Sequence, residues 1–184
     1  MNNMKTFHKL ALAAGFFCIY LQVSFGQMSF SHALGVAYYS SSNATAPGVT
    51  YAPRLNFLEL GDELTVSVGT HLGLGIAGSS REGASSFALD LPLVAEVNFG
   101  HAANPDANSS FGGFAGLGFG ISKIGSAGAF GADYNDAAGP VFNGGVRMLI
   151  KERSLGVRIS YLLNTKDGFS DVLGLNLFYT FGDF

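Results

Sequence analysis

The feature that most constrains the fold is a strict two-residue alternation of side-chain character in two neighbouring stretches of the chain. From Leu64 to Gly78, Leu, Val, Thr and Ile occupy every second position, and Thr, Ser, Gly, His and Ala stand between them. From Phe87 to Phe99, Phe, Leu, Ala and Val alternate in the same way with Ala, Asp, Pro, Val, Glu and Asn. Because successive side chains of a strand point to opposite faces, each stretch is predicted to be a strand with one apolar face.

The second face of these strands separates a membrane barrel from a soluble sheet. A solvated face is dense in Lys, Glu and Thr, whereas this one is mostly Gly, Ala and Ser with isolated charges. Charged residues make up only 12% of the chain, and Gly occurs 26 times, an unusual balance for a soluble domain. Small, hydrogen-bonded side chains suit a narrow lumen. The apolar face is therefore expected to meet lipid.

Further segments of the same kind bring the number of predicted strands to eight. They are Ser29–Ser40, Val49–Leu60, Leu64–Gly78, Phe87–Phe99, Phe111–Ser122, Pro140–Ile150, Leu155–Leu163 and Val172–Phe181. Most are at least as long as the roughly 9 to 11 residues that a tilted strand needs to cross a bilayer. The predicted fold class is all-β, an eight-stranded antiparallel up-and-down transmembrane β-barrel.

The first 26 residues have the three parts of a secretory signal peptide. Lys5 and Lys9 form a basic start, the stretch from Leu10 to Val23 is apolar, and small residues precede an expected cleavage point before Gln27. The apolar part is shorter than the roughly 20 residues of a spanning helix. We therefore expect a signal peptide over 1–26 and an outer-membrane β-barrel over 27–184, located in the cell outer membrane of a Gram-negative bacterium.

Cleavage at this point would also change the chemistry of the chain. Cys18, the only cysteine, lies in the apolar part of the signal peptide, so no disulfide or cysteine metal site is expected in the barrel. Removal of two lysines changes the formal net charge from −3 to −5. Nothing in this charge suggests a nucleic-acid partner.

The connections between the predicted strands can be sorted by side. An even number of strands puts both chain ends on one side, which for an exported bacterial barrel is the periplasm. Residues 61–63, 100–110 and 151–154 then lie on that side, and 41–48, 78–86, 123–139 and 164–171 lie on the outer side. Outer loops are usually longer than periplasmic turns. Residues 100–110 depart from that rule, and the sequence provides no reason for their length.

The stretch FGGFAGLGFGIS and the ending LGLNLFYTFGDF, together with the signal peptide, resemble the small eight-stranded outer-membrane barrels of the opacity-protein and OmpX/OmpA-barrel kind. The resemblance covers residues 27–184 as a pattern rather than as one diagnostic motif. It implies that an aromatic residue at the end of the last strand is read by the barrel-assembly machinery. Phe184 ends the chain, but the alternating set contains Tyr179 and Phe181. Either Phe181 fills the aromatic position or a bulge brings Phe184 into register.

The lumen-facing positions collect ionisable side chains. These are Arg54, His71, Asp90, Glu96, Arg147 and Arg158. Since an eight-stranded barrel is only wide enough inside for side chains, they are expected to pair into a structural polar core. The alternative is a narrow, porin-like conduit or a proton-linked switch, because histidine can titrate near neutral pH.

Enzymatic and metal-binding alternatives rest on fewer residues. Some eight-stranded barrels modify lipids with a Ser, His and acid set, and of the three histidines after the signal peptide only His71 has same-face candidates, Ser67 and the inward acids. Asp133–Asp136 gathers three oxygen-bearing side chains in a predicted outer loop but lacks the spacing of a calcium loop. We therefore expect no catalytic residue, cofactor or metal.

The resulting expectation is a non-enzymatic integral outer-membrane protein with a structural or surface-interaction role in the cell envelope. Its expected partners are outer-membrane lipids, the barrel-assembly machinery during biogenesis and an extracellular ligand at the outer loops. The competing class is a soluble periplasmic or secreted lipocalin-like barrel with its apolar face inward around an apolar ligand. Its outer surface would then consist of Gly, Ala and Ser with few charges, which is a poor solvated surface.

Overall fold

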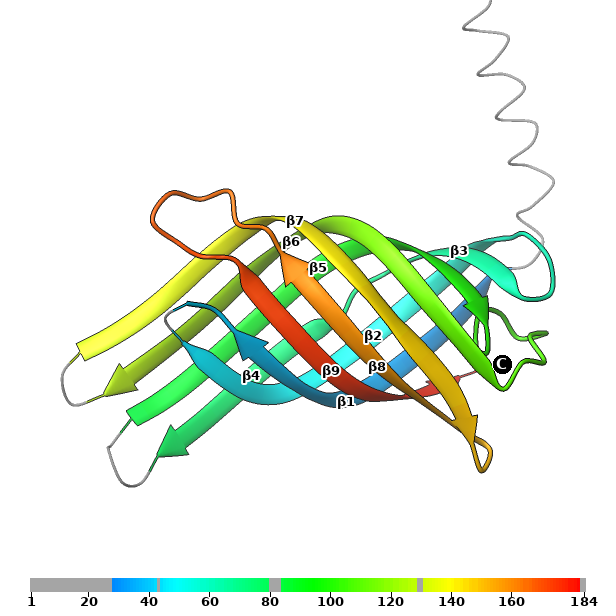
Figure 1. Ribbon diagram of the computed structural model, residues 1–184, viewed down its shortest axis with the longest axis horizontal. Coiled ribbons are helices and arrows are strands. Elements are labelled where there is room, and N and C mark those ends of the chain that lie inside the picture. Colours follow the sequence, from blue (N-terminus) through cyan, green and yellow to red (C-terminus); the bar gives the residue numbers. More distant parts are fainter. Residues whose placement is uncertain (1–27, 43, 80–83, 129–130, 183–184) are drawn as a thin grey trace, which may run out of the picture.

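The computed structural model describes residues 28–42, 44–79, 84–128 and 131–182, and its regular elements are all strands (Figure 1). They are β1 (Ser29–Ser40), β2 (Thr45–Glu59), β3 (Leu64–Gly69), β4 (Leu72–Ser79), β5 (Ala84–Gly100), β6 (Phe111–Gly128), β7 (Gly131–Ile150), β8 (Arg153–Leu162) and β9 (Val172–Gly182). Within these described residues, no helix is long and apolar enough to cross a membrane. The signal peptide and its cleavage point lie outside them.

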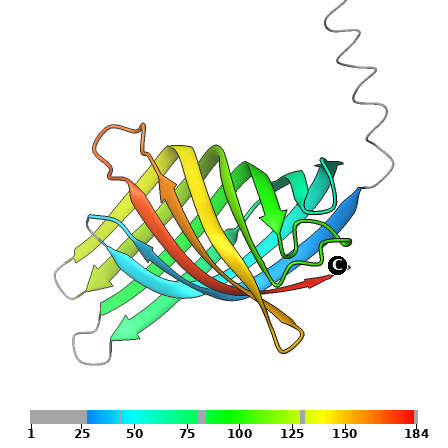
Figure 2. The same ribbon diagram turned by 45° about the vertical axis from the view of Figure 1, so that its right-hand side comes forward.

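The strands form one closed antiparallel ring (Figures 1 and 2). β1 pairs with β2 on one side and with β9 on the other, so the first and last strands close the sheet. β3 and β4 together fill one place between β2 and β5. The ring therefore has eight positions, and the predicted eight-stranded up-and-down barrel is confirmed.

The third predicted strand is interrupted at Thr70 and His71, which separate β3 from β4. The interruption causes no slip in register, because β2 pairs Arg54 with Gly69 before it and Tyr51 with Leu72 after it. His71 is still buried and Leu72 still exposed. The predicted faces therefore hold across the break.

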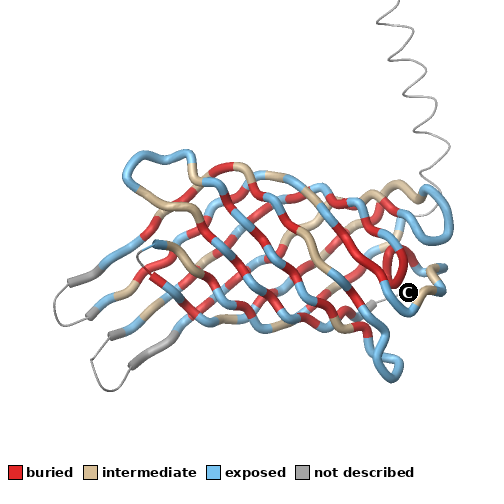
Figure 3. The backbone as a smooth tube through the Cα atoms, viewed as in Figure 1, coloured by how far each residue is buried: buried red, intermediate tan, exposed pale blue. Residues whose placement is uncertain are grey.

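The two faces of the barrel are as the alternation predicts. The outward positions hold large apolar side chains, with Leu74, Leu93 and Leu117 exposed by 60%, 64% and 67%. Along each strand, buried and exposed residues alternate (Figure 3). An apolar face on the outside contradicts the lipocalin-like alternative, which needs that face inside around a ligand.

The β6–β7 hairpin corrects one predicted connection. Residues 123–139 were expected to be an outer loop, but β6 continues to Gly128 and β7 starts at Gly131. Asp133–Asp136 is therefore part of a strand and not a loop tip, and Lys123 pairs directly with Asp136. The loop prediction failed because Gly, Ala and Ser dominate this stretch and leave little apolar alternation to detect.

Other outer connections are also shorter than predicted, since β2 begins at Thr45 and β5 at Ala84. At this end, the outer parts of β4, β5, β6 and β7 extend beyond the rest of the ring as a four-stranded sheet (Figure 1). We call this part the outer sheet: residues 76–79, 84–88, 121–128 and 131–139. The carboxyl-terminal end of β9 lies at the opposite end, which is the end predicted to face the periplasm and is called periplasmic below.

Candidate functional site in the barrel lumen

All six ionisable residues predicted to face the lumen do so. Arg54, His71, Asp90, Glu96, Arg147 and Arg158 are each exposed by 5% or less. They come from β2, the β3–β4 junction, β5, β7 and β8, so the closed ring brings distant parts of the sequence together. Their side chains form two groups: a network around Glu96 and Asn98, and a separate pair of His71 and Asp90.

Glu96 is the only carboxylate in the first group. Its Oε1 lies 3.4 Å from Arg158 Nη2 and accepts a hydrogen bond of 2.5 Å from Asn143 Nδ2. Arg147 belongs to the same network and, like Arg158, places its guanidinium over the Phe114 ring, at 4.3 and 4.9 Å from the centroid. Buried arginines are thus held by one carboxylate and by the π-face of an aromatic ring.

Asn98 joins two of the arginines that Glu96 does not bind directly. Its Oδ1 accepts hydrogen bonds from Arg54 Nη1 at 2.7 Å and Arg147 Nη1 at 2.9 Å. Its Nδ2 donates to Ser67 Oγ at 2.8 Å. A neutral amide therefore separates two like charges, and the lumen contains more buried positive than negative groups in this region.

The long connection between β5 and β6 closes the periplasmic end of the lumen. We call residues 101–110 the periplasmic plug. Arg54 Nη2 donates to the Ala102 carbonyl at 2.5 Å, and Asn56 Nδ2 donates to the Ala103 carbonyl at 3.1 Å. Ala102, Ala103 and Asn104 are exposed by 2% or less. The unexplained length of this connection is thus accounted for, because a tight turn could not reach into the barrel.

Further contacts fix the plug to the barrel rim. Asn104 Nδ2 donates to the Gly61 carbonyl at 3.1 Å, and Ser109 Oγ donates to Glu63 Oε1. His101 Nδ1 donates to the Ser109 carbonyl at 3.1 Å. Burial lowers the pKa of His101; the hydrogen bond to Ser109 opposes this effect, and the charge of Arg147 adds to it. The plug therefore favours the neutral imidazole.

His71 and Asp90 form the second group, nearer the outer end. His71 Nε2 lies 3.9 Å from Asp90 Oδ2 and is fully buried. Beside them is a cavity of about 10 Å³, which Tyr39 also lines and which has room for about one water molecule at most. A conduit along the lumen would need far more open space here.

The Ser, His and acid set considered from the sequence does not form. Ser67 is hydrogen-bonded to Asn98 in the other group, and His71 is enclosed. His101 lies in the plug, and His32 faces outward, where its Nδ1 is 2.6 Å from Tyr51 Oη. Among the described residues, no cluster of three or more His, Cys, Asp and Glu side chains could hold a metal ion.

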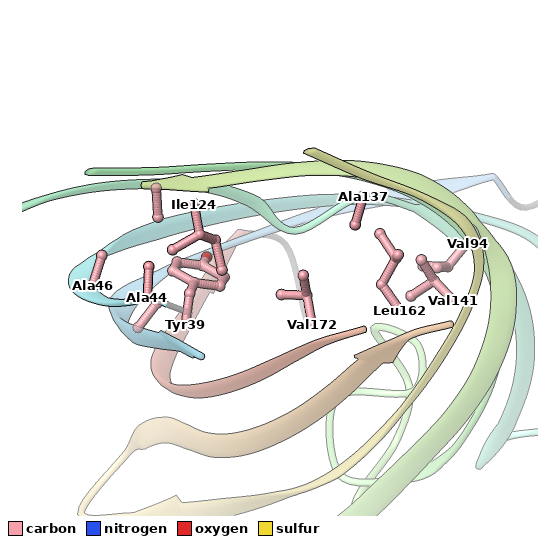
Figure 4. Packing of buried hydrophobic residues seen from close by; sticks show 11 residues of the cluster. Tyr39, Ala44, Ala46, Val94, Ile124, Ala137, Val141, Leu162 and Val172 are labelled. Carbon is pink, nitrogen blue, oxygen red and sulfur yellow. The ribbon is translucent and has the colours of Figure 1, made fainter. Parts of the chain in front are cut away.

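Apolar side chains fill the lumen at its outer end (Figure 4). We call this group the outer cap: Tyr39, Val94, Ile124, Val141, Leu162 and Val172. Each is exposed by 3% or less. Inward-facing apolar residues of this size are not part of the predicted polar lumen, and Tyr39, Val141, Leu162 and Val172 line the same small cavity as the His71–Asp90 pair.

Besides Tyr39 of the outer cap, two inward aromatic residues were missed by the sequence reasoning. Phe114 and Phe178 are buried with their ring centroids 6.2 Å apart. Facing glycines make room for them, because a Cβ on Gly145 would lie 2.6 Å from Phe114 Cζ, and one on Gly156 would lie 2.4 Å from Phe178 Cζ. The sequence signal was that large aromatic residues at lumen-facing positions lie opposite glycines of the neighbouring strands.

The residues of the predicted assembly signal lie at the end of β9. Tyr179 and Phe181 both face outward, with their ring centroids 6.2 Å apart. Phe184 lies outside the described residues. The outward position of Phe181 suits the first of the two registers considered, and the signal itself stays a prediction.

Comparison with known proteins identifies the fold. No family model matches the chain, and no curated protein matches it. Among solved structures, Ail, the attachment invasion locus protein of Yersinia pestis, matches with a TM-score of 0.55 at 12% identity, covering 84% of this chain and 97% of that one. Ail in complex with the heparin analogue sucrose octasulfate matches with a TM-score of 0.52 at 14% identity and the same coverage. The chain therefore has the fold of the small eight-stranded outer-membrane β-barrels, as its sequence pattern predicts.

Proposed function

We propose that this protein is an integral, non-enzymatic component of the bacterial outer membrane that does not conduct solutes and presents its outer sheet for contact outside the cell. The apolar outward face supports insertion into lipid, with Leu74, Leu93 and Leu117 each exposed by 60% or more. The observation that carries the rest is the closure of the lumen at both ends, which leaves the outer sheet as the accessible part.

A non-conducting barrel is favoured by what fills the lumen. The outer cap closes one end, the periplasmic plug closes the other, and the arginine network occupies the space between them. Water-filled channels occur in much wider barrels, whereas side chains fill eight-stranded ones. Reconstituted into planar bilayers, the parent protein should therefore show no channel steps in 1 M salt.

Contact with a surface is favoured by the side chains of the outer sheet. Tyr134 is exposed by 62% and packs against Phe169 with ring centroids 5.8 Å apart, while Ile76 is exposed by 87%. The similar fold of the attachment invasion locus protein of Yersinia pestis agrees with such a role without assigning a ligand. Exposed aromatic and apolar side chains on a rigid strand frame are typical of recognition surfaces.

The experiment compares intact bacteria that produce the parent with bacteria that produce a shortened β6–β7 hairpin. Replacing residues 125–134 with an Asn-Gly turn keeps the pairing of Ile124 with Asn135 and removes the tip of the outer sheet together with Tyr134. Adhesion to immobilised collagen, fibronectin and mucin should exceed that of cells lacking the protein, and the shortened hairpin should lose most of this gain. Equal adhesion by all three strains would contradict the proposed contact, while channel steps from the parent would contradict the closed lumen.

A further inference from the structure

Two prolines flank the point where β3 passes into β4. The register of β2 with β3 and β4 puts Pro53 opposite Thr70. The register of β5 with the same two strands puts Pro92 opposite His71. The Thr70 N–H donates to the Pro53 carbonyl at 3.1 Å, but a proline has no N–H with which to return such a bond. The carbonyls of Thr70 and His71 therefore receive no ladder hydrogen bond from these partners, and the interrupted strand depends on other connections.

A small pocket lies beside this interruption, inside the barrel. It has a volume of about 10 Å³. Its polar lining comes from Tyr39 of β1, His71, Asp90 of β5 and Ser160 of β8. Its apolar walls include three residues of the outer cap, Val141, Leu162 and Val172 (Figure 4). The pocket therefore joins the interrupted strand to side chains from distant parts of the ring.

The polar groups at this pocket are buried without partners. Tyr39 and His71 are fully buried, yet Tyr39 Oη and both ring nitrogens of His71 make no hydrogen bond to any described residue. His71 Nε2 lies 3.9 Å from Asp90 Oδ2, which is too far for a direct hydrogen bond. Buried polar groups in proteins are satisfied by protein or by ordered water, and water commonly bridges polar atoms at such separations.

The size and chemistry of the pocket select a water molecule over a divalent cation. Its volume is at the lower limit for one water, which needs two to four polar partners. Tyr39, His71 and Asp90 supply that number. Calcium takes at least six oxygen ligands, whereas side-chain oxygens reach the pocket only from Tyr39, Asp90 and Ser160 among the residues described as its lining. A water about 2.8 Å from both His71 Nε2 and Asp90 Oδ2 would join them at an angle of about 90°.

We propose that this pocket holds one bound water molecule that bridges His71, Asp90 and Tyr39. The water ties the β3–β4 junction to β5 and β1 on the lumen side, at the place where the two prolines cannot complete the ladder. The contact between His71 and Asp90 is then a water-mediated hydrogen bond and not a direct ion pair.

The first test is NMR spectroscopy of the folded protein in detergent micelles, with labelled histidine and phenylalanine. The ring protons of His71 should show a nuclear Overhauser effect from water, with the sign of a long-lived bound molecule. Phe142, which faces the detergent, is the control and should show none. Absence of the effect at His71 would mean a dry pocket and would overturn the proposal.

Two variants separate a bound water from other sources of the signal. Val141→Ile adds a methyl group to the pocket wall and should displace the water, so the effect at His71 should disappear. Val146→Ile, outward on the same strand, is the matched control and should keep it. Tyr39→Phe removes one partner of the water, so the effect should weaken and persist. A signal that survives in Val141→Ile, or one that Tyr39→Phe abolishes and thereby assigns to the Tyr39 hydroxyl, would contradict the proposal.

Hydrogen exchange tests the connection to the interrupted strand. Once heat-dependent gel mobility shows that the variants are folded, the amides of residues 70–72 should exchange about tenfold faster in Val141→Ile than in Val146→Ile, the effect expected for the loss of one hydrogen bond. Loss of the water signal without faster exchange would show that the water does not hold the junction, and would overturn that part of the proposal.

Discussion

The two ends of the lumen are closed by different chemistry. At the outer end, Ile124, Leu162 and Val172 belong to β6, β8 and β9, and they fill the space as apolar side chains. At the periplasmic end, a separate segment is inserted, and Arg54 and Asn56 hold it by its backbone carbonyls. The outer closure is built into the strands, whereas the periplasmic closure is a separate segment whose release is expected to leave the barrel intact.

The difference between the two closures follows from what each kind of filling needs: apolar side chains need only to be buried, whereas a buried loop needs hydrogen-bond partners. Apolar side chains need no hydrogen-bond partners, so burial alone stabilises the outer cap. The backbone groups of a buried loop must each find a hydrogen-bond partner. The arginine network meets that need, and its cost is a set of buried charges that depend on Glu96.

The largest effect should follow removal of that carboxylate. Glu96→Ala leaves Arg158 and Asn143 without their shared acceptor and should lower the free energy of unfolding by about 3 to 5 kcal/mol. Urea titration in lipid vesicles, followed by heat-dependent gel mobility, measures this change. Asp62→Ala, in an exposed turn, is the control. Equal stability of the two variants would show that the network does not hold the lumen together.

The outer cap should be next in sensitivity. Ile124 is fully buried, so Ile124→Ala should create a cavity and cost about 2 to 4 kcal/mol. Ile121→Ala, on the outward face of the same strand, is the control and should cost less, because lipid can fill the space. The same urea titration applies. A larger loss at Ile121 than at Ile124 would reverse the inward assignment of the cap.

Arg54→Met should separate the two closures. It removes the hydrogen bonds to Asn98 and Ala102 and should cost about 2 kcal/mol. Because the outer cap is untouched, proteinase K should cleave within the plug while the barrel keeps its heat-dependent mobility. Arg153→Met serves as the control at an exposed site. Resistance of the plug in Arg54→Met would mean that its other contacts suffice.

The smallest effect concerns pH. The folded plug lowers the pKa of His101, so the unfolded segment binds the proton more readily. The stabilising contribution is therefore complete above the unfolded value of about 6.5 and declines as the pH falls below it. The protection factors of residues 101–110, which are hydrogen-exchange rates corrected for the slower intrinsic exchange at low pH, should fall between pH 7 and pH 5. His101→Gln should remove most of this dependence, and an identical fall in that variant would assign it to another group.

The faces of the barrel could be predicted from the sequence because a period of two fixes them without any knowledge of pairing. That is why all six lumen residues were placed correctly, down to His71 beside an interruption of its strand. The partners could not be predicted. Whether Glu96 meets Arg158 or Arg54 depends on the stagger of strands that lie far apart in the sequence.

The plug and the outer sheet were missed for two further reasons. The residues of the plug satisfy their polar groups through contacts with β2, and nothing local in HAANPDANSS reveals this. The outer parts of β6 and β7 are rich in Gly, Ala and Ser, which have little contrast between faces. Pairing with each other, rather than intrinsic preference, makes these residues strands.

The closure of the ring by β1 and β9 has a consequence for the order of folding. Most neighbouring strands are also neighbours along the chain, so their pairing closes only short loops, but β1 and β9 come from opposite ends of the barrel sequence. Joining them has the largest entropic cost and should come last. Until that step, both end strands have unpaired edges, and the nascent sheet is at its most vulnerable to association with other chains.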